Sequence, residues 1–329
     1  MSMTVIPQLL DVTLRDGGYV NDWNFSIPNA VRIVSTLSGA RIPYIEVGYY
    51  RPRLASDGSQ RPDPMYCSSE YLDAVSQVRN GSELSVMVHL SDVRPEDYSF
   101  LVDHGISLVR FVVPTEAIPS IEAHIDMAHR VGLACSINLI RLSERSLKSV
   151  ILCARTAEAM GADWLYAADS NGSMFPDRVE QIFRELASEV RIPLGFHAHD
   201  SLRLAFANSL AALHVGGRLL DSSLGGMGKG AGNLVTELIT AYLKSIYEVQ
   251  FDITQLAGVA CELLSDWIGI DHRRKCESAL SALLDLNADI LKDVVAAAEK
   301  AERPLLLELE RGLNVRGIEK DGEAATHNH

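Results

Sequence analysis

The sequence predicts an α/β protein, a (β/α)8 TIM barrel followed by a small C-terminal helical region. Eight short β-like runs alternate with helix-like stretches over roughly 220 residues, close to the ~250 residues of a typical barrel. The runs are rich in Val, Ile and Leu, as strands covered on both faces are. A doubly wound open sheet is the alternative, and the lack of a GxGxxG motif after the first run counts against it.

Each expected element follows from its residue pattern, taken in chain order. The expected strands are Gln8–Leu14, Tyr44–Gly48, Leu84–Leu90, Leu108–Val113, Ala134–Ile140, Trp164–Ala168, Leu194–His199 and Leu219–Ser222. Segments with apolar residues at helical spacing are Glu70–Arg79, Ile121–Val131, Leu147–Met160, Pro176–Val190 and Leu202–His214. Several of these helices run into Gly, as in HRVGL and EAMGAD, which is a common helix stop.

The alternation of strands and helices stops after about Val249. Three candidate helices then follow with no strand between them: Phe251–Ile268, Glu277–Leu286 and Ala288–Lys300. We therefore expect a barrel over residues 1–249, a helical region over 250–316 that packs on or beside it, and a disordered polar tail over 317–329.

Composition narrows the class of protein. The 329 residues carry a formal net charge of −13, which argues against nucleic acid as a partner, because a phosphate backbone needs a basic face. The five cysteines are odd in number and lack CxxC spacing, as in reduced cytosolic proteins. Neither a signal-peptide pattern nor an apolar run of membrane-spanning length is present, so we expect a soluble cytoplasmic protein without a membrane partner.

Two histidines in the segment GFHAHD form the sharpest local feature. Because side chains alternate faces along a strand, His197 and His199 point the same way, whereas Phe196 and Ala198 point toward the helices. At the C-terminal end of a seventh barrel strand, the two imidazoles line the interior and form one edge of a metal site. A hydrogen-bonded pair of core histidines is the structural alternative.

The segment DVTLRDGG ends the expected first strand, and Gly17 and Gly18 allow a sharp turn there. Arg15 and Asp16 are therefore expected at the same mouth as the two histidines. One carboxylate and two imidazoles suit a divalent cation, Mn²⁺ first, with Mg²⁺, Co²⁺ or Zn²⁺ as alternatives. Taken alone, Arg-Asp at a turn is usually a surface salt bridge or a cap, so its weight comes from the combination.

Two loops supply further candidate groups. Ser170 and the backbone amides of AADSNG, after the sixth run, are placed to hold a carboxylate, with a plain polar loop as the alternative. The Gly-rich loop SLGGMGKGAGN follows the eighth run, where barrels often bind anions. It lacks a P-loop ending, since Lys229 is followed by Gly230. Asn233 is a further candidate metal ligand from this loop, and a merely flexible loop is the alternative.

Together these segments resemble the DRE-TIM metallolyase superfamily of HMG-CoA-lyase-like enzymes, and within it the family of 4-hydroxy-2-oxovalerate aldolases. The matching pieces are the opening TLRDG, the HxH pair and the GAGN segment. The similarity covers the barrel, residues 7–245, and more loosely the helical tail. The combined motifs are specific for the superfamily and less specific for the reaction.

The resemblance implies a divalent-metal-dependent lyase that makes or breaks a C–C bond between pyruvate, as its enolate, and an aldehyde. It implies that Arg15 stabilises the charge that develops on the keto oxygen. It also implies that Ser170, Asn171 and neighbouring amides hold the substrate carboxylate. The metal ligands that it implies are Asp16, His197 and His199.

One position departs from the aldolase pattern. The aldolases carry a His three residues after the metal Asp as the proton-transferring base, and this chain has Tyr19 there. Tyr19 is the expected acid/base group, and a plain aromatic wall is the alternative. The aldolases' tail also turns a Tyr toward the site, whereas CESALSALLDLN has none. Further candidates at expected strand ends are Glu46, Tyr49, Tyr50, His89, Asn138 and Arg141.

Two other functions stay open at this point. The first is an acetyl-CoA-dependent Claisen-type acyltransferase, similar to 2-isopropylmalate or homocitrate synthases, although DGGY matches the aldolases better than the LREGxQ opening of such synthases. The second is a non-catalytic barrel subunit that kept the metal and lost the base. An acylating aldehyde dehydrogenase is a partner implied by the resemblance. A homo-oligomer formed through Ala288–Lys300 is a further expectation, with a monomer that buries this face on its own barrel as the alternative.

Overall fold

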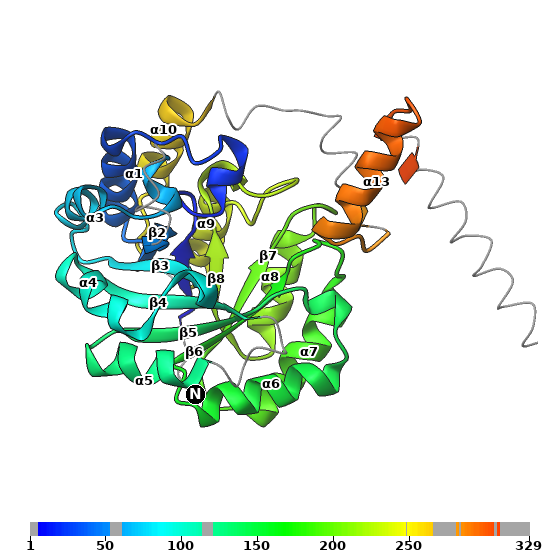
Figure 1. The fold of residues 1–329 in the computed structure, drawn as a ribbon, viewed down its shortest axis with the longest axis horizontal. Helices are drawn as coiled ribbons and strands as arrows, with labels where there is room; N and C mark the ends of the chain where they lie inside the picture. Colours follow the sequence, from blue (N-terminus) through cyan, green and yellow to red (C-terminus); the bar gives the residue numbers. More distant parts are fainter. Residues whose placement is uncertain are drawn as a thin grey trace, which may run out of the picture.

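The computed structural model describes residues 6–52, 61–113, 121–247, 249–265, 281–282, 284–305 and 308–309. Within them, eight parallel strands close into a barrel in sequence order, β1 to β8, with helices around the outside (Figure 1). The predicted (β/α)8 TIM barrel is therefore confirmed.

The strands run close to the predicted bounds. They are β1 Gln8–Asp11, β2 Tyr44–Tyr49, β3 Glu83–His89, β4 Ile106–Val113, β5 Ala134–Leu139, β6 Trp164–Asp169, β7 Leu194–Ala198 and β8 Gly217–Ser222. The α-helices are α1 Ile27–Gly39, α3 Ser69–Ser76, α4 Tyr98–Asp103, α5 Glu122–Arg130, α6 Leu147–Ala159, α7 Pro176–Glu189, α8 Ala205–His214, α9 Thr236–Tyr247, α10 Ile253–Leu263 and α13 Ala288–Lys300. Short 3-10 helices are η1 Gly17–Val20, η2 Asp63–Met65, η3 Leu90–Asp92, η4 Pro95–Asp97, η6 Leu142–Glu144 and η7 Leu224–Gly226.

Local sequence explains several helix ends. Ser26, Ser68 and Ser146 cap α1, α3 and α6, because each hydroxyl accepts a hydrogen bond from a backbone amide of the first turn. Gly132 and Gly161 follow α5 and α6 with φ of 90° and 82°, the left-handed region in which glycine ends helices at low cost. Helices α1, α4 and α9 were not among those expected.

The first strand is shorter than predicted, and the reason is local. The strand ends at Asp11 and not at Leu14, because the Asp11 carboxylate accepts the backbone N–H of Thr13 at 2.9 Å. The amides of Arg15, Asp16 and Gly17 then all donate to the carbonyl of Val12, at 2.8–3.1 Å. A tight turn therefore carries Arg15 and Asp16 over the barrel mouth, where an extended strand would have pointed them in opposite directions.

One layer of the barrel interior is charged. Glu46, Arg110, Tyr166 and Asp221 come from the alternate strands β2, β4, β6 and β8, which is how a barrel fills one layer. Arg110 is fully buried and pairs with Asp221 at 2.7 Å and with Glu46 at 3.2 Å, while its guanidinium lies 4.3 Å from the Tyr166 ring centroid. Contacts between β4 and β8 cross the barrel, so these side chains fill its centre.

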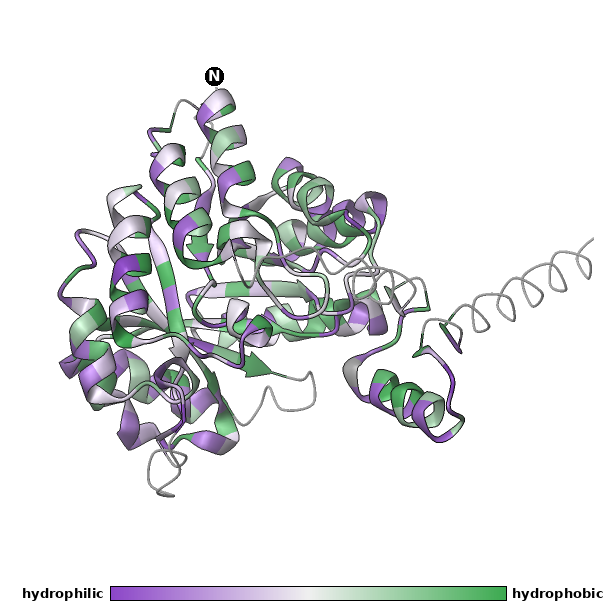
Figure 2. Ribbon diagram, turned by 90° about the horizontal axis from the view of Figure 1, so that it is seen from above, coloured by the Kyte–Doolittle hydropathy of each residue, from purple (hydrophilic) through white to green (hydrophobic). Residues whose placement is uncertain are grey.

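Apolar clusters make up most of the remaining core. Leu10, Val12 and Leu108 form a buried cluster at the N-terminal end of the barrel, with Tyr44 and Trp164 packed edge to face against each other, 4.7 Å between centroids. Figure 2 shows green, apolar residues along the strands and purple residues on the outer turns of the helices. Within the described residues, no helix combines the length and the apolar character needed to cross a membrane.

Two helices of the C-terminal region lie next to the barrel at different places. Helix α10 contacts α1, whereas α13 stands beside the mouth (Figures 1 and 2). Helix α13 matches the predicted bounds, and α10 is shorter than the predicted Phe251–Ile268 as far as the description reaches. Of the predicted helix Glu277–Leu286, residues 281–282 are helical and 284–285 form a turn, and its remaining residues up to 283 lie outside the described ones, as does the tail over 317–329.

Gly195 gives a test of the charged layer. A Cβ at this position would come within 2.5 Å of the buried Tyr166 ring. We expect Gly195→Ala to lower the free energy of unfolding by about 1–3 kcal/mol, because Tyr166 cannot move away from Arg110 without breaking the packing of the layer. Urea unfolding measures this change.

The matched control is Gly258→Ala in α10, where an added Cβ meets nothing within 4 Å. Helix propensity should make this variant more stable by up to about 1 kcal/mol. Equal stability of the wild type and Gly195→Ala would show that the layer is loosely packed.

Candidate metal centre and active site

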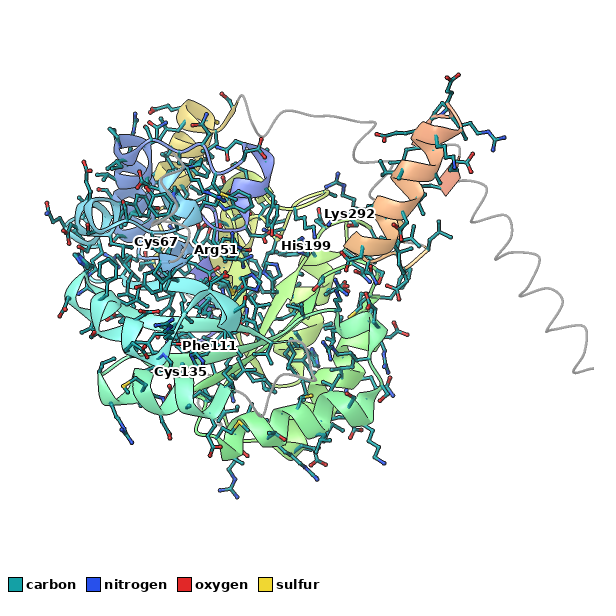
Figure 3. The ribbon with its side chains drawn as sticks, in the orientation of Figure 1. Arg51, Cys67, Phe111, Cys135, His199 and Lys292 are labelled. Carbon is teal, nitrogen blue, oxygen red and sulfur yellow. The ribbon has the colours of Figure 1, made fainter. Side chains whose placement is uncertain are left out.

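Three side chains that are far apart in sequence meet at the barrel mouth. One potential ligand atom from each of Asp16, His197 and His199 lies within 4.8 Å of the others, and all three residues are buried. Asp16 comes from the turn after β1 and His197 from β7, while His199 lies just beyond β7, in an isolated antiparallel bridge with Asn233. The structure thus brings together the three residues predicted as metal ligands (Figure 3 labels His199).

The alternation along β7 positions the two imidazoles. Phe196 packs edge to face against Phe183 of α7, at 5.5 Å between centroids, and so faces the helices as predicted. His197 and His199 point the other way, and their rings lie 4.9 Å apart. The strand is one residue shorter than predicted, but the bridge to Asn233 keeps the backbone at His199 extended.

The electrostatics of the cluster favour a charged carboxylate beside neutral imidazole. Burial by itself would raise the pKa of Asp16, but the Arg15 guanidinium and the two imidazoles hold it well below its usual value. Burial lowers the pKa of His199 to about 4, despite the neighbouring Asp16 carboxylate. A carboxylate and a neutral imidazole at neutral pH are the forms that bind a metal.

A chain of buried ion pairs starts from Asp16. The Arg15 guanidinium donates from Nη1 to Asp16 at 2.5 Å and from Nε to Glu46 at 2.5 Å. Glu46 in turn pairs with Arg110 at 3.2 Å, inside the charged layer. Arg15 is therefore held in place from two sides, and its Nη2 makes no hydrogen bond within the described part of the chain.

The same chain of ion pairs ends on the other side of the cluster. Arg110 donates to Asp221 at 2.7 Å, and the same Asp221 oxygen lies 2.9 Å from His197 Nδ1. Burial raises the pKa of Asp221, but Arg110 and His197 bring it below its usual value. The carboxylate orients the ring of His197 and leaves Nε2 for the cluster, an arrangement common behind metal-binding histidines.

Asn233 reaches the cluster from the Gly-rich loop. Its Nδ2 donates to Asp16 at 2.8 Å and to the Met227 carbonyl at 3.0 Å. The loop folds tightly, because a Cβ on Gly232, at φ +102°, would come within 2.0 Å of the Gly226 carbonyl oxygen. Only glycine therefore fits at position 232, which explains a glycine directly before Asn233.

These residues fit a divalent cation on two observations. Three buried carboxylates, Asp16, Glu46 and Asp221, stand against two guanidinium groups, which leaves one negative charge when the imidazoles are counted as neutral. In addition, Nδ1 of His199 and Oδ1 of Asn233 are buried without a hydrogen-bond partner. Buried polar atoms normally have partners, so the site matches the oxygen and nitrogen donors that such cations take.

Two cavities meet at this cluster. The smaller, of about 190 Å³, lies at the barrel mouth and is lined by Arg15, Asp16, His197 and residues of β3 to β6. The larger, of about 620 Å³, lies between the mouth and the C-terminal segment. The residues that line both are Tyr19, Ser170, Asn171, His199 and Lys229.

Tyr19 stands where the cavities join. Its ring packs edge to face on Trp23 at 4.5 Å, and its hydroxyl lies 3.4 Å from that of the buried Tyr49. The Lys229 ammonium lies 5.8 Å from the ring centroid. The phenol is therefore part of the site and borders both cavities.

Ser170 and Asn171 differ in their surroundings. The Ser170 hydroxyl accepts the backbone N–H of Arg141 at 2.9 Å, which leaves its own proton to donate. The Asn171 amide donates to Ser143 at 3.1 Å and to Asp285 at 2.9 Å, so it links the β6 loop to the C-terminal segment.

The remaining candidates differ in whether they line the smaller cavity. His89, Asn138 and Arg141 line the smaller cavity together with Tyr49, and Glu46 lies beneath it in the charged layer. Tyr50 is not among the lining residues, because its ring stacks on Phe100 and its hydroxyl donates to the Asp97 carbonyl at 3.3 Å.

Sequence reasoning missed two members of the ion-pair chain. Arg110 sits in LVRFVV and Asp221 in RLLDSS, and a single charged residue inside an otherwise apolar strand is the signal that points to both. Lys229 was noted only for its failure to complete a P-loop. In the described part of the chain it has no ion pair, and it lines both cavities.

A second group with metal-ligand character lies at the other end of the barrel. His129, Cys135 and Asp163 bring one potential ligand atom each within 4.8 Å. The Asp163 carboxylate already accepts the Cys135 amide at 2.7 Å and lies 2.9 Å from His129. TIM-barrel active sites lie at the C-terminal ends of the strands, so this group is treated as structural.

The fold and the cluster together define a barrel enzyme of the lyase type, and the comparisons agree. The chain belongs to the HMGL-like family, which it matches over residues 6–261. It is 30% identical over 318 residues to the 4-hydroxy-2-oxovalerate aldolase of Moorella thermoacetica, with 94% of this chain and 93% of that protein covered.

Solved structures agree on the fold. The N-terminal domain of a putative aldolase from Bacteroides vulgatus superposes with a TM-score of 0.75 at 24% identity, over 88% of this chain and 96% of that one. HMG-CoA lyase of Bacillus subtilis gives a TM-score of 0.69 at 18% identity, over 79% and 93%.

Asp221 gives a test of the metal centre. We expect Asp221→Asn to weaken Mn²⁺ binding about 10- to 100-fold, because the amide no longer supports His197 with a full negative charge. Mn²⁺ titration followed by electron paramagnetic resonance measures the affinity.

The matched control is Asp163→Asn, which also removes a carboxylate next to a histidine, but at the opposite end of the barrel. Its Mn²⁺ affinity should equal that of the wild type. Equal weakening in both variants, or none in either, would place the metal elsewhere.

Proposed function

We propose that the protein is a divalent-metal-dependent aldolase, a class II aldehyde-lyase, which joins pyruvate or a similar 2-keto acid to an aldehyde or cleaves the product. The observation that carries this proposal is the convergence of Asp16, His197 and His199 with Arg15 around a small cavity. Relatives named 4-hydroxy-2-oxovalerate aldolase along almost the whole chain support it.

The metal ligands proposed are Asp16, His197 and His199, with Asn233 as a fourth, and Mn²⁺ is the first choice among Mn²⁺, Mg²⁺, Co²⁺ and Zn²⁺. When bound, the cation supplies a Lewis acid that polarises the keto group of the substrate. Availability in the cell decides among such cations as much as affinity does.

Arg15 binds the keto oxygen in this proposal. Its Nη2 is the guanidinium nitrogen left over by Asp16 and Glu46, and Arg15 lines the smaller cavity. Because two carboxylates fix the guanidinium beforehand, it stabilises the enolate oxygen without reorganising. The Ser170 hydroxyl donates to the substrate carboxylate, while Asn171 holds the loop that carries Ser170.

Tyr19 is the proposed acid/base group. In the direction of synthesis Tyr19, as its phenolate, takes a proton from the methyl carbon of the 2-keto acid and becomes the phenol, and the enolate carbon forms a bond to the aldehyde carbon. The same phenol then returns the proton to the aldehyde oxygen, so atoms and charges balance. The acid/base group must exchange protons with both substrates, so it must border both cavities. Tyr19 lines both of them, whereas His89 lines the smaller cavity and not the larger one.

The acetyl-CoA-dependent acyltransferase is the alternative enzyme. Methyl-proton exchange of pyruvate in D₂O with Mn²⁺, without CoA, supports the aldolase. Release of CoA from acetyl-CoA without such exchange supports the acyltransferase, and turnover of any kind rules out a non-catalytic subunit. The cytoplasmic location, a homo-oligomer and an acylating aldehyde dehydrogenase partner stay predictions.

Asp16→Asn and His199→Ala should abolish metal-dependent methyl exchange, because each removes one of the proposed metal ligands. Circular dichroism should show an intact fold, since both residues lie at the mouth and outside the strands. Full activity in both variants would show that the site lies elsewhere.

The proton-transferring group is tested by two variants. We expect Tyr19→Phe to lower the rate of methyl exchange about 10²- to 10⁴-fold, as for a lost general base, and His89→Asn to lower it less than about tenfold. NMR of the pyruvate methyl signal in D₂O gives both rates.

The pH profile distinguishes the two groups. Burial and the Arg51 guanidinium lower the pKa of His89 below its usual 6.5, against the pull of Asp92. If His89 were the base, its neutral form would be active above pH 6.5 and the rate would fall as the pH drops through the lowered pKa. An acidic limb there that disappears in His89→Asn would contradict the assignment to Tyr19.

A further inference from the structure

The larger cavity opens onto the metal cluster from the side of the C-terminal segment. It shares Tyr19, Ser170 and His199 with the smaller cavity, so a molecule in it lies next to the site of C–C bond formation. Figure 3 shows His199 on the side of the barrel that faces α13, with Lys292 near the end of that helix closer to the mouth. The cavity is therefore continuous with the reaction site.

The larger cavity has a greater volume than a small aldehyde needs. At ~30 Å³ for a water-sized group, the three non-hydrogen atoms of acetaldehyde fill only about 90 Å³. The smaller cavity, about 190 Å³, is large enough for the six non-hydrogen atoms of pyruvate, about 180 Å³ on the same scale, and the larger one, about 620 Å³, lies within the range of about 300–1,000 Å³ that is usual for ligand pockets. A two-carbon acceptor would leave most of it to water.

The outer wall of the larger cavity has an apolar part, beside which Lys292 and Glu299 of α13 also line the cavity. Leu291 and Val295 are four residues apart on α13, so they lie on one face of the helix, and Leu286 and Ala296 extend this surface. Ile290, on the same helix, is 46% exposed and does not line the cavity. The α13 wall, defined by residues 286, 291, 295 and 296, is thus an apolar surface on one side of a wet cavity.

Hydrogen bonds fix this wall to the barrel. The Asp285 carboxylate accepts from Ser143 at 2.9 Å, Asn171 at 2.9 Å and Ser173 at 2.7 Å, which belong to the loops after β5 and β6. Asp289 accepts from Arg141 at 2.8 Å. The loops that form the site therefore also hold the helix that encloses the larger cavity.

We propose that the larger cavity binds the carbonyl acceptor, and that this acceptor is an aldehyde with an unbranched apolar chain of at least about six carbons that packs against the α13 wall. The aldehyde carbon lies at the Tyr19 junction and the chain runs toward Leu291 and Val295. This inference rests on the proposed aldolase function and adds the class of its second substrate.

The wild-type enzyme is tested with pyruvate, Mn²⁺ and the aldehydes acetaldehyde, propanal, butanal and hexanal. Burial of each added CH₂ should raise kcat/KM about fourfold, so full burial of the chain should make hexanal exceed acetaldehyde by about 200-fold. A flat or falling series would overturn the proposal. Methyl exchange of pyruvate without any aldehyde tests the aldolase function separately, because a failure there sinks the function and not merely the acceptor class.

Two variants locate the effect on the wall. Val295→Asp places a charge on the α13 wall and should lower kcat/KM for hexanal at least about tenfold more than for acetaldehyde. Ile290→Asp makes a similar exchange on the same helix outside the cavity, and should leave the series unchanged. An equal loss for both aldehydes in Val295→Asp, or the same loss in Ile290→Asp, would show that the helix acts on stability and not on the acceptor.

Discussion

A continuous chain of buried ion pairs determines the shape of the site. It runs from Asp16 through Arg15, Glu46 and Arg110 to Asp221 and back to the cluster at His197. Each guanidinium pairs with two carboxylates. Removal of either guanidinium would therefore leave buried carboxylates without their partner, a loss that typically costs about 3–5 kcal/mol. The ion pairs therefore fix the orientation of Arg15 and His197 at the barrel mouth. The charged layer in the centre of the barrel thus positions side chains of the site.

Much of the architecture could be predicted from the sequence, because strand alternation and helical spacing are local signals. The barrel and the meeting of residues 16, 197 and 199 both followed from such signals. The end of β1 did not, since it depends on the Asp11 carboxylate taking the Thr13 amide. Nor did the pairing of Arg110 with Asp221, which joins residues 111 positions apart across the barrel and has no periodic signature.

Tyr19 is the site residue at which the sequence departs from the expected aldolase pattern. Its ring packs edge to face on Trp23, and its hydroxyl lies beside that of Tyr49. Asn171 lines both cavities, and its amide donates to Ser143 and Asp285. Its contact with substrate stays a prediction, whereas its contact with Asp285 depends on where the C-terminal segment lies.

The placement of α13 has a consequence for how this enzyme type diversifies. All the proposed proton- and metal-handling groups come from residues up to 233, whereas the apolar wall comes from residues 286–296, which are held by a few carboxylate contacts. The proposed metal ligands and the α13 wall of the proposed acceptor site thus lie in separate stretches of the chain. Recombination that exchanged only the end of the chain would replace the α13 wall and leave the proposed metal ligands unchanged.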